Sequence, residues 1–183
     1  ISVRDMGNNF DYIQTLSSIS NKQGSFTPFI YKAGWIDGKS NWNFQYSGYQ
    51  ANNKEDAEKW VEKYYKGGFN QIKIWENLRK DIAESIISKA HQKGMKVVGH
   101  IPGAFSFGNI IEAGINQISH LSEIVYAYEQ DSIYNTIEKV VDLFSKYKVG
   151  IDPTFLVMDI GWRNKNQPLS EIEPGAAFAN KYV

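Results

Sequence analysis

The sequence contains no cysteine, only three histidines and no long apolar run. Without cysteine the fold has no disulfide, and cysteine usage leaves both a cytoplasmic and a periplasmic or secreted location open. No stretch approaches the about 20 apolar residues that a membrane-spanning helix needs. The 20 basic and 20 acidic residues give a formal net charge of zero, so the composition does not indicate binding to nucleic acid.

What the sequence does contain is a regular alternation of strand-like and helix-like segments. Residues 54–66 place their apolar side chains on one helical face after Asn53, a good capping residue, and residues 71–75 follow as a short strand. Further strands are predicted at 2–5, 26–32, 96–100, 115–120 and 149–152, and further helices at 78–90, 107–113 and from the cap Asp131 to 144. This alternation predicts parallel strands joined by right-handed helical crossovers.

The number of strands limits the possible architectures. A (β/α)8 barrel has eight units in about 250 residues, whereas about six strands are predicted in these 183 residues. The alternatives are an open, doubly wound sheet and an incomplete barrel. Residues 35–52 are polar, aromatic and aperiodic, and we expect them to form a long loop, a kind of segment that often has a function.

Two of the three histidines stand at the ends of consecutive predicted strands. In parallel α/β folds the chemistry is located at the C-terminal strand ends, which here present Asp5, Lys73, His100, His120 and Thr154. Imidazole is a standard zinc ligand, and two of them on neighbouring parallel strands lie within reach of one ion. The alternatives are hydrogen-bonded structural histidines and, for Lys73, a charge that protects an edge strand.

Four segments of the chain, in the same order, resemble motifs of the amidohydrolase superfamily in its imidazolonepropionase-like and prolidase-like branch. VRDMG at 3–7 resembles TTVRDMGG, and GFNQIKI at 68–74 resembles GADxIKI. AHQKGMKVVGH at 90–100 resembles AHxxGxxVxxH, and EAGINQISH at 112–120 resembles EAGVDSIEH. An ordered set of four motifs is far more specific than any one of them.

This resemblance implies a partial (β/α)8 barrel, approximately strands two to seven, with a metal centre. It implies that Lys73, His100 and His120 bind one or two divalent ions, with zinc the expected metal, and that Lys73 is carboxylated by CO2. Burial favours the neutral, nucleophilic form of a lysine, which this modification needs. The implied activity is hydrolysis of C–N bonds in amides, cyclic amides or dipeptides by metal-activated water. Independently of the resemblance, Tyr126 and Tyr128, which follow His120, are candidates for binding the substrate, with a role in packing as the alternative.

The chain also departs from the family pattern. The first-strand HxH pair and the eighth-strand aspartate have no counterpart, and neither Asp152 nor Asp159 fits the place of that aspartate, so the catalytic residue is unassigned. We therefore expect residues 1–183 to form an incomplete amidohydrolase-type barrel domain. Alone, it is expected to bind metal weakly, to associate with itself through its open strand edges and to show little turnover.

Two other functions remain open on the residues themselves. One is a non-catalytic α/β module that binds a partner or small ligand through residues 35–52. The other is a barrel enzyme that forms a Schiff base at Lys73.

Overall fold

The computed structural model of the chain describes residues 1–40, 48–130, 132–156, 167–168 and 171. Its parallel sheet follows the order β1 (Ser2–Asp5), β2 (Phe29–Asp37), β4 (Gln71–Ile74), β5 (Lys96–Gly99), β6 (Gln117–Ser119) and β7 (Gly150–Asp152). A short strand, β3 (Tyr49–Gln50), pairs with the end of β2. Every described pair is parallel, which confirms the predicted class of fold.

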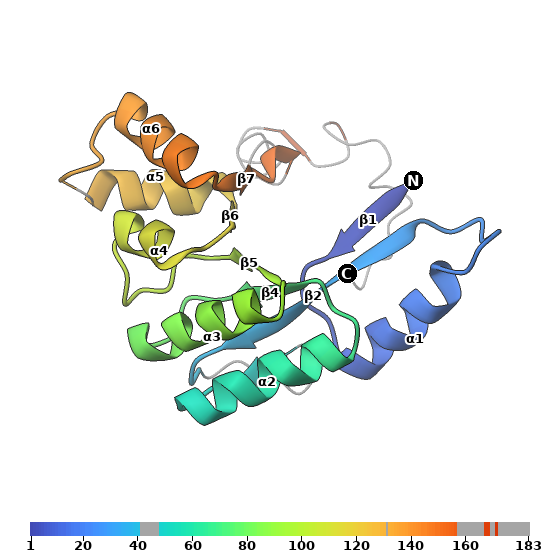
Figure 1. The fold of residues 1–183 in the computed structure, drawn as a ribbon. Helices are drawn as coiled ribbons and strands as arrows, with labels where there is room; N and C mark the ends of the chain where they lie inside the picture. The colour runs from blue at the N-terminus through green and yellow to red at the C-terminus, as the bar shows by residue number, and fades with distance from the viewer. Residues whose placement is uncertain (41–47, 131, 157–166, 169–170, 172–183) are drawn as a thin grey trace.

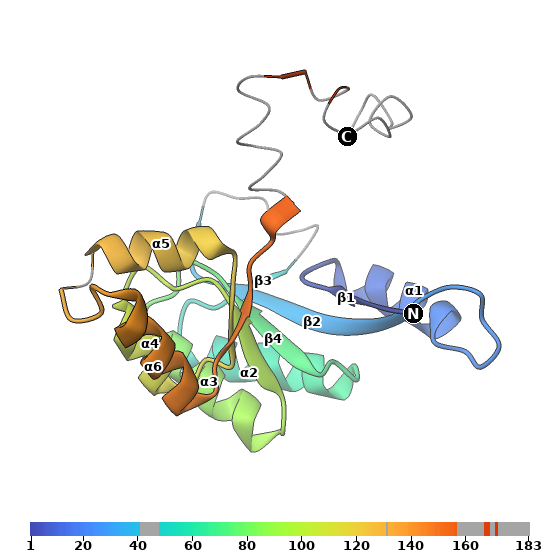
Figure 2. The ribbon, with the colours of Figure 1, turned by 90° about the horizontal axis from the view of Figure 1, so that it is seen from above.

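Six helices accompany the strands in the described part of the chain (Figure 1). They are α1 (Phe10–Ser20), α2 (Lys54–Lys66), α3 (Lys80–Gln92), α4 (Phe107–Ala113), α5 (Leu121–Gln130) and α6 (Ile137–Tyr147). Helices α2 and α3 lie side by side against the middle of the curved sheet, and α4 packs against α6 (Figures 1 and 2). The result is the predicted partial (β/α)8 barrel. None of these helices is long and apolar enough to cross a membrane.

The centre of the molecule is built from strands and helices whose apolar side chains face each other. Helix α2 begins after Asn53, whose side chain accepts a hydrogen bond from the backbone N–H of Asp56 at 2.7 Å. The cap satisfies one of the free donors at the helix start. The helix then buries one face against the sheet, and the core residues that are fully inaccessible include Val61, Tyr64, Ile36, Ile72, Ile74 and Ile86.

Two glycines allow the backbone to approach neighbouring groups in this centre. A Cβ atom on Gly34 would lie 2.2 Å from the ring of Tyr64. Gly99 has a φ of +126°, and a Cβ atom there would lie 2.3 Å from the carbonyl oxygen of Ile74. Because only glycine adopts this backbone without a steric penalty, Gly99 sets the direction in which the chain leaves β5 toward His100.

The two outer strands, β1 and β7, are joined across the sheet by side chains. The guanidinium of Arg4 on β1 donates to the carboxylate of Asp152 on β7 at 2.7 Å. It also donates to the side-chain oxygen of Gln117 on β6. This charge-assisted network links strands that share no backbone hydrogen bonds in the described structure.

The structure corrects the prediction for the segment between residues 26 and 52. Strand β2 does not end at Lys32 but continues to Asp37, and β3 interrupts the expected loop at Tyr49. The physical reason is pairing, because residues 33–36 of β2 form the ladder with β4 and place Ile36 in the core. Residues 41–47 lie outside the described part of the chain.

The predicted helices are corrected as well. Helices α1 and α5 were not predicted, although Asn9 caps α1 through its side chain. The later helix begins at Ile137 after the cap Thr136, and the predicted cap Asp131 lies outside the described residues. In contrast, α4 has the predicted cap Ser106 and ends as predicted, at a left-handed Gly114.

Candidate metal centre

The three candidate metal ligands lie at the C-terminal ends of three adjacent strands. Lys73 is on β4, His100 directly follows β5, and His120 directly follows β6. The rings of the two histidines meet nearly edge to face, with centroids 4.8 Å apart. The fold thus brings the two histidines together at the strand ends where parallel α/β proteins place their chemistry.

The interpretation of Lys73 as a charge that protects an edge strand is wrong, because β4 lies between β2 and β5. The side chain is 8% exposed. Its Nζ atom lies 4.5 Å from the centre of the Trp75 ring and has no hydrogen bond or ion pair with a described residue. Burial lowers the pKa of Lys73, and the negative charge of Asp5 opposes this only in part. A buried lysine with a lowered pKa is a better nucleophile than a lysine in water.

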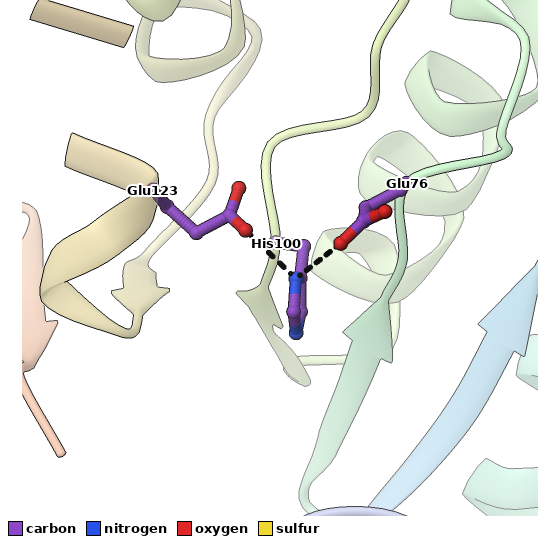
Figure 3. A group of neighbouring side chains, drawn as sticks. All are labelled: Glu76, His100 and Glu123. Carbon is purple, nitrogen blue, oxygen red and sulfur yellow. Dashed lines mark hydrogen bonds and ion pairs between the residues drawn. The ribbon is translucent and has the colours of Figure 1, made fainter. Parts of the chain in front are cut away.

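His100 is buried between two carboxylates (Figure 3). Its Nδ1 atom lies 3.0 Å from Oε1 of Glu123 and 3.3 Å from Oε1 of Glu76. The other oxygen of Glu123 accepts a hydrogen bond from the backbone N–H of Ile101 at 3.2 Å. Burial raises the pKa of Glu123, but the hydrogen bond from His100 and the other favourable contacts outweigh burial and lower it overall. Glu123 is therefore an ionised acceptor that orients the imidazole.

The opposite nitrogen of His100 is left without a partner. Nε2 is buried and makes no hydrogen bond in the described structure. A buried polar atom of this kind costs free energy unless something satisfies it. Metal-binding histidines usually donate their second ring N–H to a carboxylate, and the contact of Nδ1 with Glu123 has this form. His100 thus fits an ion at Nε2.

His120 is held by a different group. Its Nδ1 atom lies 2.7 Å from Oγ1 of Thr154, in the segment that follows β7. Burial lowers the pKa of His120, and the nearby charges of His100 and Lys73 lower it further. A metal-binding imidazole must be neutral, so this environment favours the form that binds an ion.

A second arrangement of ligand atoms is present on the other side of His100. Among the described residues, Glu76, His100 and Glu123 each offer a ligand atom, and these atoms lie within 4.8 Å of one another. The side chain of Glu76 is 55% exposed. A cation at this position would bind Nδ1 of His100, whereas an ion shared with His120 would bind Nε2.

Sequence reasoning missed three side chains of this site: Trp75, Glu76 and Glu123. The Trp75 ring lies 3.7 Å, centre to centre, from the ring of His100. Glu76 follows β4 by two residues and Glu123 is in the first turn of α5. Their position just beyond strand ends was the available signal, but the direction of Glu123 depends on a helix that was not predicted.

The other residues considered from the sequence are either outside the described side chains or have partners elsewhere, and substrate binding by Tyr126 and Tyr128 stays a prediction. The side chains of Tyr126 and Tyr128 lie outside the described part of the structure, and so does Asp159. Nε2 of His91 lies 3.1 Å from the side-chain oxygen of Asn116, at the end of α3. Asp5 accepts hydrogen bonds from the backbone N–H of Gly7 and the side chain of Asn8, and thus caps a turn.

Several solved structures resemble this fold. The structure of A. niger ochratoxinase matches with a TM-score of 0.68 and 15% identity, over 92% of this chain and 45% of that one. A Xaa-Pro dipeptidase with bound methionine matches with a TM-score of 0.64 and 18% identity, over 92% of this chain and 46% of that one. Bottromycin amidohydrolase matches with a TM-score of 0.59 and 18% identity, over 78% of this chain and 32% of that one. No family model and no curated protein sequence matches the chain.

These neighbours are named as an ochratoxinase, a dipeptidase and an amidohydrolase, and at 15% to 18% identity their likeness confirms the fold that the four motifs indicated. The chain spans between 32% and 46% of the length of the three structures. It therefore has the fold of a segment of these structures, and fold alone does not assign an activity.

Proposed function

We propose that the chain is the central barrel segment of a divalent-metal-dependent hydrolase that cleaves C–N bonds in amides, cyclic amides or dipeptides. The observation that supports this proposal most directly is the pair of histidines 4.8 Å apart at adjacent strand ends, where Nε2 of His100 is buried without a partner. Imidazole is a standard ligand of such an ion, and the two histidines would supply two of the three protein ligands that a catalytic zinc usually takes.

The residues would divide the work as follows. His100 and His120 would hold the ion through ring nitrogens, and Lys73 would contribute oxygens after carboxylation. When bound, zinc or a related ion supplies an activated water and polarises a carbonyl group. Glu123 would orient His100, as it does in the hydrogen bond at 3.0 Å. A substrate would be a small molecule or a dipeptide, in keeping with the Xaa-Pro dipeptidase among the structural neighbours.

The proposal is tested by metal binding with a matched control. The chain contains three histidines, and only His91 is outside the site. We expect His100→Asn and His120→Asn each to lower zinc and manganese affinity by at least tenfold, whereas His91→Asn leaves it unchanged. Metal content after dialysis and competition titration would measure this. Equal affinity in all three variants would overturn the proposed centre.

Carboxylation of Lys73 has its own test. The neutral amine would attack the carbon of CO2, form an N–C bond and release one proton, which gives a carbamate. We expect metal affinity to rise with bicarbonate in the wild-type chain and to be independent of bicarbonate in Lys73→Met. A carbamate signal in carbon-13 NMR with labelled bicarbonate would identify the adduct, and its absence at every metal concentration would exclude it.

One specific observation favours a second candidate function. The lowered pKa of Lys73, caused mainly by burial, also suits Schiff-base formation with a carbonyl substrate. Borohydride would then trap a substrate covalently on Lys73 without added metal. Trapping that persists in His100→Asn would favour this function over hydrolysis.

We further propose that the incomplete barrel associates with a second copy through its outer strands and shows little turnover alone. Val3 on β1 and Ile151 on β7 are 46% and 42% exposed, and both strands have a free edge in the described sheet. Val3→Lys and Ile151→Lys should each shift the chain toward the monomer in sedimentation experiments. Detectable zinc-dependent amide hydrolysis by the monomer would contradict the expected inactivity.

A further inference from the structure

Two residues near the site have a backbone conformation that side chains rarely adopt. His120 has a φ of 71° and Thr154 a φ of 48°, both in the left-handed region. For a β-branched residue such as threonine this is a genuine outlier. Such conformations persist only where the surroundings enforce them, and they concentrate at functional sites.

The backbone around both residues is fixed by hydrogen bonds that continue beyond the strands. The N–H of His120 donates to the carbonyl of Asp152 at 2.7 Å, and the N–H of Leu121 donates to the carbonyl of Pro153 at 3.2 Å. These bonds extend the pairing of β6 with β7 into the region where both chains turn. The two left-handed residues therefore face each other, and their side chains meet at 2.7 Å between Nδ1 and Oγ1.

We infer that Thr154 is a positioning residue for His120: its hydroxyl accepts the Nδ1 proton and leaves the Nε2 lone pair free for a metal ion. The functional role of this contact rests on the proposed metal centre, whereas the contact itself does not. His100 has the same arrangement, with Nδ1 against Glu123 and Nε2 buried without a partner. At His120 a hydroxyl takes the place that the carboxylate of Glu123 has at His100, and it carries no charge. The two histidines then present equivalent nitrogens from adjacent strand ends.

The decisive measurement is the tautomer of His120 in the metal-free chain, read from nitrogen-15 chemical shifts. We expect the Nδ1–H form in the wild-type chain. Thr154→Val keeps the shape and the branched Cβ, and hence the backbone cost, but removes the hydroxyl; it should shift His120 toward the Nε2–H form. Thr154→Ser keeps the hydroxyl and should restore the Nδ1–H form. An Nε2–H form in the wild-type chain would overturn the inference.

Zinc affinity provides the second measurement. We expect Thr154→Val to weaken zinc binding about 10- to 100-fold, the usual effect of removing a group that orients a metal-binding histidine. Thr154→Ser should remain close to wild type, and His91→Asn serves as the control. If His120 has the same tautomer in Thr154→Val and in the wild-type chain, Thr154 acts only in packing, whatever the zinc affinity, and the inference is overturned. A wild-type chain in the Nδ1–H form that binds no zinc would support the positioning but overturn the proposed metal centre.

Discussion

The centre of the sheet and its two outer parts differ in how completely their apolar side chains are covered. In the centre, Ile72 and Ile86 are fully buried. At the outer parts, Ile137 on α6 is 71% exposed and Val3 on β1 is 46% exposed. The same kinds of residue thus contribute hydrophobic stabilisation in one region and remain in contact with water in the other. The buried core, and with it most of the stability, therefore lies in β2, β4, β5 and β6 with α2, α3 and α4, and the candidate metal centre stands at the end of that stable block.

The largest expected effect comes from one substitution made in both regions. Ile86→Ala should lower the free energy of unfolding by about 2 to 5 kcal/mol, because it leaves a cavity in a closely packed core. Ile137→Ala should change it by less than about 0.5 kcal/mol, since the side chain is already solvated. Denaturant unfolding of both variants would measure the difference. Equal losses would mean that α6 is covered in solution, for example by a second copy.

Lys73 is the charged exception within the stable block. Replacing it by methionine should raise the free energy of unfolding by on the order of 1 kcal/mol at neutral pH, because the cost of burying the ammonium disappears. Burial lowers the pKa of Lys73 in the folded state from 10.5, so between the lowered pKa and 10.5 the unfolded state binds more protons. The stability of the wild-type chain should therefore rise with pH over this window and approach that of Lys73→Met.

A constant difference between the two proteins up to pH 10.5 would contradict the proposed cost of burying Lys73. A less stable Lys73→Met would also contradict it, because it would mean that Lys73 supports the fold. In either case the lysine would need a structural explanation in place of a chemical one.

Helix caps test whether the two regions also differ in local structure. Asn53→Ala, at the start of α2, should lower the free energy of unfolding by about 1 kcal/mol, because it leaves a backbone N–H without its acceptor. Thr136→Ala, at the start of α6, should cost less, because its hydrogen bond to Lys139 is longer, 3.3 Å against 2.7 Å, and α6 is more exposed. Hydrogen exchange of the first turn of each helix would show the local effect. A larger loss from Thr136→Ala would place α6 within the cooperative core.

The smallest effect is expected from a surface ion pair between α2 and α3. Glu62 lies 2.8 Å from Lys93, and the hydrogen bond from Lys93 lowers the pKa of Glu62 below 4.5. The pair therefore stabilises the fold above pH 4.5, and this contribution is lost as the pH falls through the lowered pKa. Glu62→Gln should lower the melting temperature by less than either cap variant, and only above that pH. A larger shift would indicate that the pair is shielded from solvent.

The sequence predicted the elements that depend on local signals better than those that depend on distant pairing. Periodicity and caps located α2 and α4, because Asn53 and Ser106 act locally. The end of β2 was missed because its pairing with β4 depends on residues distant in the sequence. Helix α5 was missed because the side-chain pattern after His120 is ambiguous until the sheet gives the segment a face to cover.

For the candidate site, the sequence located the groups on strand ends, including Thr154, but not which groups contact each other, and it missed Glu123. Position along a strand is local information, so Lys73, His100 and His120 could be named in advance. Glu123 contacts His100 across 23 residues of chain and Thr154 contacts His120 across 34. These contacts require the register of neighbouring strands, which a periodic pattern does not contain.

The ion pair between Arg4 and Asp152 has a consequence for how the chain is made. The two residues are 148 positions apart, and a ribosome that adds about 5 to 20 residues per second needs roughly 7 to 30 s to cover that distance. Strand β2 follows β1 closely and can pair with it early, but the arginine meets its carboxylate only after β7 has emerged. Throughout that interval Arg4 lacks its partner Asp152 beside an open strand edge, and unpaired strand edges make a newly made chain prone to association with other chains.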